Sequence, residues 1–226
     1  MPGIKFKADD RITIAGLPGT GKTTLAKYLG SLLVPHLLIY DPLAQYEGFP
    51  DECRYIPKSD SLEEFDGICR QLRAKGDTTF LIEESERYLG QGKPLHSNTF
   101  DLINRGRNWG VGVIAVTRRI QRLSKDYFDL CQRHFLFKCG LKSREYIAEM
   151  IGKDRLRDIM RLAEYHFLYY DINTETSSVH FLTLGPTERV EEARGEKPSK
   201  EPEAKPKEEG DERIESTAAS SPHTED

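Results

Sequence analysis

The chain has 226 residues, of which 37% are hydrophobic and 31% charged, with a formal net charge of −4. This is enough for one well-buried core but hardly for two, so we expect a single folded domain. Four cysteines stand far apart without a C-x-x-C pair, which favours a reducing, cytoplasmic setting. No segment approaches the roughly 18 consecutive apolar residues of a membrane-spanning helix, so we expect no membrane segment.

The charge is unevenly distributed. From Pro186 onward the chain is rich in Glu, Lys, Pro and Ser and almost without aliphatic or aromatic side chains. Such a segment cannot bury enough apolar surface to offset its ordering entropy, so we predict a folded domain over 1–185 and a disordered tail over 186–226. The tail holds thirteen acidic and seven basic side chains, which leaves the folded part mildly basic, at roughly +2.

Short apolar runs alternate with helix-like stretches along most of the chain. The apolar runs predict strands over 11–15, 37–41, 78–82, 111–116 and 134–138. The stretches between them predict helices over 22–33, 62–74, 99–108 and 122–131. Nearly all-apolar strands that alternate with helices indicate an α/β fold with a mostly parallel sheet, flanked by helices on both faces.

The pattern changes after Ser143. Two short helices are predicted over 144–151 and 155–164. Two apolar runs, 166–171 and 178–184, then flank a polar turn. They predict a C-terminal β-hairpin that closes one edge of the sheet.

The strongest motif is GLPGTGKTT, from Gly16 to Thr24, between the first strand and the first helix. It matches the phosphate-binding loop, in which glycines let successive N–H groups point at phosphate oxygens at a helix N-terminus. Lys22 would reach the β and γ phosphates, and the Thr23 hydroxyl would hold Mg²⁺. The alternative is a glycine-rich turn without a ligand, which the flanking strand and helix disfavour. The predicted nucleotide-binding residues are Gly16, Pro18, Gly19, Thr20, Gly21, Lys22, Thr23 and Thr24.

The third strand runs into two carboxylates in FLIEESERYLG. P-loop ATPases place one acid near Mg²⁺ at such a strand end and a second beside the attacking water. By position, Glu83 takes the metal-side role and Glu84 the catalytic role. Glu83 stands where an aspartate is usual, so we expect it to contact Mg²⁺ through water. The alternative is an acidic, solvated helix start.

Basic residues crowd the segment from Arg105 to Arg144, which holds ten Lys or Arg. This density suits phosphates of a nucleotide or of nucleic acid, although a solvated basic face is the alternative. Arg105 and Arg107 precede the fourth strand and Arg118 follows it, near the ends where a doubly wound sheet keeps its active site or its subunit contacts. An arginine delivered to a neighbour's γ-phosphate accelerates hydrolysis strongly, so a ring of subunits is a mechanistic hypothesis. The predicted catalytic residues are Lys22, Glu84, Arg105, Arg107 and Arg118.

Together, GLPGTGKTT, LLIYDPLAQY, FLIEESERYL and RGRNWGVGVIAVTRR resemble, in this order and spacing, the FtsK/HerA superfamily of DNA-pumping ATPases. The resemblance covers roughly residues 11–151. It implies a RecA-like P-loop NTPase core, usually a hexameric ring, ATP hydrolysis with Mg²⁺ and translocation of double-stranded DNA. It also implies a Walker B pair at Glu83 and Glu84 and a trans-acting finger at Arg105 or Arg107. Relatives commonly have Gln where this chain has Arg118, which puts a γ-phosphate sensor role there in doubt.

Size narrows the resemblance. About 185 ordered residues leave no room for the extra domains of cellular members, so the chain is most similar to genome-packaging ATPases of tailless icosahedral, membrane-containing DNA viruses. That likeness implies packaging into a preformed capsid, a homo-oligomeric ring, and capsid or portal-vertex proteins as partners. The setting would be the host cytoplasm or the virion.

Two other function classes remain open. A small-molecule or nucleotide kinase could share the P-loop and the length, but it would need an acceptor pocket and a mobile arginine-bearing lid. The segment YLGQGKPLHS, 88–97, is short for a lid. A nucleotide-gated assembly or export factor of filamentous phage type would bind nucleotide with negligible turnover.

Overall fold

The computed structural model describes residues 4–59, 61–92 and 94–183. Within these residues one eight-stranded sheet has the strand order β3-β2-β4-β5-β1-β6-β7-β8. The first six strands in this order are parallel, and β7 and β8 are added antiparallel to β6. The strands are β1 (Arg11–Ala15), β2 (Leu37–Tyr40), β3 (Arg54–Tyr55), β4 (Thr79–Ile82), β5 (Gly112–Thr117), β6 (Arg133–Phe137), β7 (His166–Asp171) and β8 (Thr176–Phe181).

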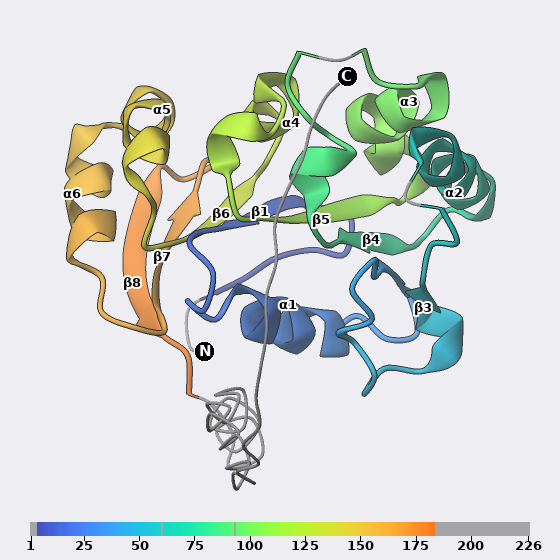
Figure 1. Cartoon of the computed structure of the whole chain (residues 1–226), viewed down its shortest axis with the longest axis horizontal. Helices are drawn as coiled ribbons and strands as arrows, with labels where there is room; N and C mark the ends of the chain where they lie inside the picture. Colours follow the sequence, from blue (N-terminus) through green and yellow to red (C-terminus); the bar gives the residue numbers. More distant parts are fainter. Residues whose placement is uncertain (1–3, 60, 93, 184–226) are drawn as a thin grey trace, which may run out of the picture. The chain divides into compact units, whose positions relative to one another are not determined.

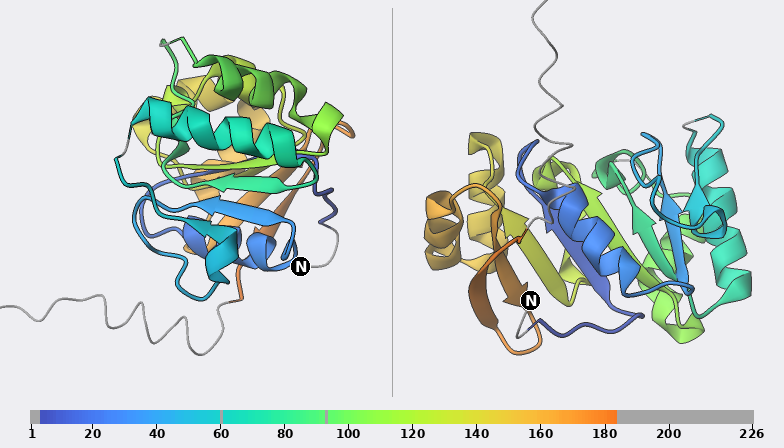
Figure 2. Two further views of the ribbon diagram at one scale, coloured as in Figure 1. Left: turned by 90° about the vertical axis from the view of Figure 1, so that its right-hand side faces the viewer. Right: turned by 90° about the horizontal axis from the view of Figure 1, so that it is seen from below.

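Helices cover both faces of the sheet. Figures 1 and 2 show α1 on one face and α2, α3 and α4 on the other, with α5 and α6 beside the antiparallel strands. The α-helices are α1 (Lys22–Ser31), α2 (Leu62–Lys75), α3 (Ser97–Arg105), α4 (Lys125–Asp129), α5 (Leu141–Ile151) and α6 (Lys153–Arg161). Short 3₁₀ turns are η1 (Asp51–Cys53), η2 (Ser85–Arg87), η3 (Gly106–Trp109) and η4 (Ile120–Arg122). Because both faces are covered, every residue of β1, β4 and β5 is buried.

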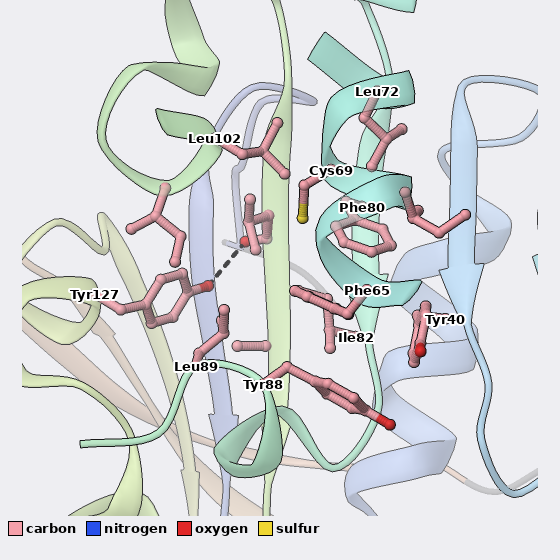
Figure 3. Close-up of a cluster of buried hydrophobic side chains, with 14 of the residues drawn as sticks. Tyr40, Phe65, Cys69, Leu72, Phe80, Ile82, Tyr88, Leu89, Leu102 and Tyr127 are labelled. Carbon is pink, nitrogen blue, oxygen red and sulfur yellow. Dashed lines mark hydrogen bonds between the residues drawn. The ribbon is translucent and has the colours of Figure 1, made fainter. Parts of the chain in front are cut away.

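Aromatic side chains fill the core between the sheet and α2 (Figure 3). The Phe65 ring stacks on Tyr88 with centroids 4.6 Å apart, and Tyr40 packs edge-on against Phe65 at 5.0 Å. Tyr127 from α4 is fully buried, and its hydroxyl donates to the carbonyl oxygen of Ile12 at 2.9 Å. This bond satisfies a buried polar group and ties α4 to the centre of the sheet.

The five predicted parallel strands are confirmed, each within one residue at either end. The hairpin at the sheet edge is also confirmed, although its second strand starts two residues earlier than predicted, at Thr176. The predicted helix over 122–131 is wrong in extent, because α4 has only five residues. Before α4 the chain is extended and bridges Gly90 to Leu123, with Ser124 N donating to Leu89 O. Sequence periodicity could not detect this long-range pairing. The two-residue strand β3 was not predicted.

The predicted disordered tail, 186–226, lies outside the described residues, so its boundary stays a prediction. Among the residues that the structure does describe, no helix is long and apolar enough to cross a membrane.

Two glycines, one at the start of β5 and one in α2, test how tightly these two elements are packed. A Cβ at Gly112 would collide with the backbone carbonyl of Ala8 and lie 2.9 Å from Asp10 O. We expect Gly112→Ala to lower the free energy of unfolding by about 2 kcal/mol or more. In α2, Gly67 has no atom within 4 Å of such a Cβ, so Gly67→Ala should raise it by about 0.5–1 kcal/mol. Urea unfolding measures both, and an unchanged stability for Gly112→Ala would contradict the close approach of residues 8–10 to β5.

Candidate active site

Four loops meet at the carboxyl ends of the parallel strands. They follow β1, β2, β4 and β5, and β5 pairs with both β1 and β4. A cavity of about 250 Å³ lies between them. Its lining residues are Pro18, Gly19, Lys22, Thr23, Gln45, Glu83, Glu84, Val116, Thr117 and Arg118.

The loop after β1 curls so that its own carbonyl group anchors it. Lys22 Nζ and Thr20 Oγ1 both donate to Leu17 O, at 2.6 and 2.8 Å. Gly21 precedes α1 with φ of 97°, a left-handed conformation, and a Cβ there would lie 2.8 Å from Leu182 Cδ1. The left-handed φ is what favours glycine here, and a larger residue would also displace the end of the Leu182 side chain.

Lys22 is only 7% exposed. Burial lowers its pKa to about 8, against the opposing effect of the Glu83 carboxylate. A cation held in a partly desolvated cavity interacts strongly with an incoming phosphate.

Glu83 is the buried acid of the site, at 5% exposure. The Tyr46 hydroxyl donates to Glu83 Oε1 at 2.6 Å, and Thr23 also hydrogen bonds to this carboxylate. Burial raises the pKa of Glu83, while the bonds from Tyr46 and Thr23 and the charge of Lys22 act against that rise. These groups keep a charged carboxylate tolerable inside the protein.

Sequence reasoning missed the support that the loop after β2 gives to Glu83. Asp41 is fully buried and accepts hydrogen bonds from the backbone N–H groups of Gln45 and Tyr46, both at 2.9 Å. This turn aims Tyr46 at the carboxylate. The segment LLIYDPLAQY carried part of the resemblance, and its buried-strand-then-Asp pattern was the available signal.

Glu84 lies beside Arg118 at the ends of β4 and β5. Arg118 Nη2 is 2.8 Å from Glu84 Oε1. Glu84 has a φ of 49°, which is a left-handed backbone conformation. In a residue other than glycine this conformation costs about 1–3 kcal/mol, and such residues are concentrated at functional sites. The Ser85 hydroxyl donates to Val116 O at 2.9 Å and holds this turn against β5.

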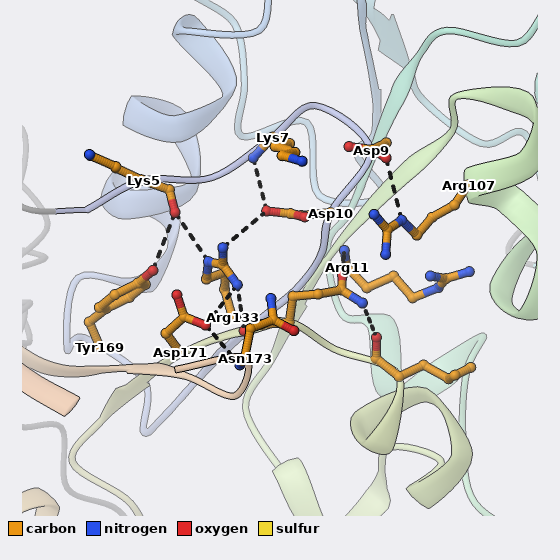
Figure 4. A network of polar contacts seen from close by, with 12 residues as sticks. Lys5, Lys7, Asp9, Asp10, Arg11, Arg107, Arg133, Tyr169, Asp171 and Asn173 are labelled. Carbon is orange, nitrogen blue, oxygen red and sulfur yellow. Dashed lines mark hydrogen bonds and ion pairs between the residues drawn. The ribbon is translucent and has the colours of Figure 1, made fainter. Parts of the chain in front are cut away.

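The structure separates the two groups of arginines that flank β5. Arg118 lines the cavity at the carboxyl end of β5. Arg105 and Arg107 come before β5 and lie at the amino ends of the parallel strands. Arg107 Nε is 3.3 Å from Asp9 Oδ2, within the polar network of Figure 4. Arg105 is 63% exposed and 3.6 Å from Asp101. Of the predicted arginines, only Arg118 therefore lines this cavity, and a role of Arg105 or Arg107 on a neighbouring subunit stays a prediction.

Of the other predicted nucleotide-binding residues, four do not line the cavity. They belong to the loop or to the first turn of α1: Gly16, Thr20, Gly21 and Thr24.

A larger cavity of about 590 Å³ lies between η2, η4 and the starts of α2 and α3. It contains none of the predicted site residues, and it lacks a glycine-rich turn at a helix start. The smaller cavity is therefore the better nucleotide site.

The donor set beside Lys22 fits Mg²⁺. Thr23 and Glu83 present hydroxyl and carboxylate oxygens that already hydrogen bond to each other, and Mg²⁺ prefers oxygen ligands while keeping several waters. These two residues would hold the ion, and their role as Mg²⁺ ligands stays a prediction.

No protein-family model and no curated protein sequence matches the chain. Solved structures do. The genome packaging NTPase B204 from Sulfolobus turreted icosahedral virus 2, in complex with AMPPCP, aligns with a TM-score of 0.70 at 20% identity, over 79% of this chain and 100% of that one. The fold is that of a P-loop NTPase.

Two further structures show how widely this fold extends. B204, the DNA-packaging ATPase from Sulfolobus turreted icosahedral virus, aligns with a TM-score of 0.71 at 18% identity, over 79% of this chain and 100% of that one. VirB4 of Thermoanaerobacter pseudethanolicus aligns with a TM-score of 0.53 at 11% identity, over 79% of this chain and 90% of that one. The P-loop NTPase fold agrees with the FtsK/HerA resemblance of the sequence.

The pKa of Lys22 predicts how nucleotide affinity varies with pH. Phosphate binding favours the charged amine, which is lost as pH rises through about 8. Above that pH we expect the affinity for an ATP analogue to fall by up to about tenfold per pH unit. Lys22→Arg, which stays charged, should remove this decline whatever its affinity at pH 7. Calorimetric titrations from pH 7 to 9.5 measure it, and a Lys22→Arg profile as steep as wild type would assign the decline to another group.

Proposed function

We propose that this chain is an ATPase that binds ATP with Mg²⁺ and hydrolyses it to translocate double-stranded DNA, most specifically to package a viral genome into a preformed capsid. The observation that carries the ATPase is the meeting of four groups in one cavity at a helix N-terminus. Lys22 and Thr23 come from the P-loop, and the carboxylates of Glu83 and Glu84 come from the end of β4.

Each group has a part in hydrolysis. The loop N–H groups and Lys22 bind the phosphates, and Thr23 and Glu83 hold Mg²⁺, which neutralises developing charge when bound. Glu84 accepts a proton from water as the water oxygen bonds to the γ-phosphorus. The bond from that phosphorus to the bridging oxygen breaks, which gives ADP and inorganic phosphate. Glu84 then returns its proton to solvent.

DNA translocation is supported by two further observations. The two B204 structures are genome-packaging proteins, and their full length superposes on this chain. The segment from Arg105 to Arg144 concentrates basic side chains that suit a phosphate backbone. On this proposal the chain works as a homo-oligomeric ring in the host cytoplasm or on the virion, with capsid or portal-vertex proteins as partners.

The proposed ring places Arg107 and Arg105 against a neighbour. Both side chains are more than two-fifths exposed and lie at the amino ends of the strands, away from the P-loop cavity of the same subunit. They could therefore reach a γ-phosphate only in an adjacent subunit. A finger of this kind acts on charge that develops in the transition state.

ATP hydrolysis as a function of protein concentration and DNA tests the proposal. We expect the rate per chain to rise with protein concentration and with long duplex DNA, more strongly at low salt. Lys22→Ala should abolish the activity in every condition. Phosphoryl transfer to a small molecule without DNA would indicate a kinase instead, and nucleotide binding with negligible turnover would indicate an assembly factor. Either result would make the translocase proposal wrong.

Mixing experiments test the trans-acting arginine. We expect Arg107→Ala and Lys22→Ala to be inactive alone and their mixture to recover part of the DNA-stimulated rate, because a Lys22→Ala subunit supplies Arg107 to the intact site of an Arg107→Ala neighbour. Arg157→Ala is the matched control, since Arg157 is exposed on α6 and pairs with Asp154 at 3.0 Å; alone it should keep the wild-type rate. A mixture of the two inactive variants that stays inactive would contradict action in trans.

A further inference from the structure

The ion pair between Arg118 and Glu84 lies within reach of any ligand in the P-loop cavity. Both residues line that cavity together with Lys22. The Arg118 side chain is 49% exposed and that of Glu84 27% exposed. Arg118 Nη2 and Glu84 Oε1 are 2.8 Å apart, a short, charge-assisted contact. In this arrangement the predicted catalytic carboxylate is already occupied by a cation.

The backbone at both ends of the pair is fixed, so a change of partner must come from the side chains. Glu84 is held in its left-handed turn by the bond from Ser85 Oγ to Val116 O. Arg118 follows Thr117, which pairs with Ala15 at the start of the P-loop. The long Arg118 side chain can swing at a half-exposed site without disturbing either strand.

A bound phosphate would compete with Glu84 for Arg118. The pKa of Lys22 is lowered first by burial, and the charge of Arg118 lowers it further. The two cations therefore act on the same small volume, where an anion would be attracted to both. Guanidinium groups bind phosphate oxygens in a bidentate manner, and the γ-phosphate carries more charge than one carboxylate.

We propose that Arg118 exchanges between the Glu84 carboxylate and the γ-phosphate of ATP. On Glu84, Arg118 neutralises the group that takes the proton from water. On the γ-phosphate, it releases that group and stabilises the triphosphate. Arg118 is thus a positioning residue for Glu84 and the group that distinguishes ATP from ADP. This inference rests on the proposed ATPase function and names how its site recognises its substrate.

The exchange depends on a guanidinium group at this position. A glutamine there could hydrogen bond to a phosphate but could not form an ion pair with a carboxylate. An arginine couples the two events. Phosphate recognition and release of the base then become a single movement.

A double-mutant cycle in nucleotide affinity tests the exchange. Wild type, Glu84→Gln, Arg118→Gln and the double variant are titrated with ATPγS and with ADP, each with Mg²⁺, by calorimetry on the full chain. Glu84→Gln frees Arg118, so its ATPγS affinity should rise about fivefold, a coupling typical of contacting side chains. Arg118→Gln should lower ATPγS affinity about tenfold through loss of a charge-assisted bond. With Arg118→Gln present, adding Glu84→Gln should change it less than about twofold.

Controls separate this mechanism from others. ADP affinity should stay within about twofold in all four proteins, Arg118→Lys should recover part of the ATPγS preference, and Arg157→Gln should match wild type. If Glu84→Gln improves ATPγS binding equally with and without Arg118, Glu84 acts only through its own charge and the exchange is wrong. If folded wild-type protein binds neither nucleotide, the proposed function fails, and the inference with it.

Discussion

The burial of two opposite charges, Lys22 and Glu83, at the carboxyl edge of the sheet is the constraint on which the site depends. Each is less than a tenth exposed, and a buried charge is tolerated only when other groups stabilise it. Lys22 has the carbonyl oxygen of Leu17, and Glu83 has Tyr46 and Thr23. These contacts hold together the loops that follow β1, β2 and β4.

The position of β5 in the sheet determines which loops meet at the cavity. β5 lies between β1 and β4, with Ala115 level with Ile82 and Thr117 level with Ala15. The residues that follow these strands consequently emerge side by side at one edge. This is why Glu84, Arg118 and the P-loop share a cavity although they are far apart in the chain. The large aromatic core under α2 keeps the sheet in place behind them.

Because the strands are parallel, their carboxyl ends and their amino ends carry different functional groups. The carboxyl ends of the strands carry the cavity, and the opposite ends carry Arg105. The opposite ends also carry Arg107 and the ion pairs around Asp10 and Arg133 (Figure 4). In the proposed ring, one edge of each subunit would face the opposite edge of the next. Hydrolysis in one subunit would then depend on the placement of its neighbour, a useful property for a motor that moves along a polymer.

The sequence by itself determined the parallel strands, the hairpin and the P-loop, because these depend on local periodicity and on residues close together in the chain. It also indicated Glu83 and Glu84 as an acidic pair at a strand end. Only the tertiary structure decided which groups meet across long separations: Tyr46 with Glu83, Arg118 with Glu84, and the strand pairing that shortens α4. Contacts of this kind arise from strand order and register, which local patterns do not encode.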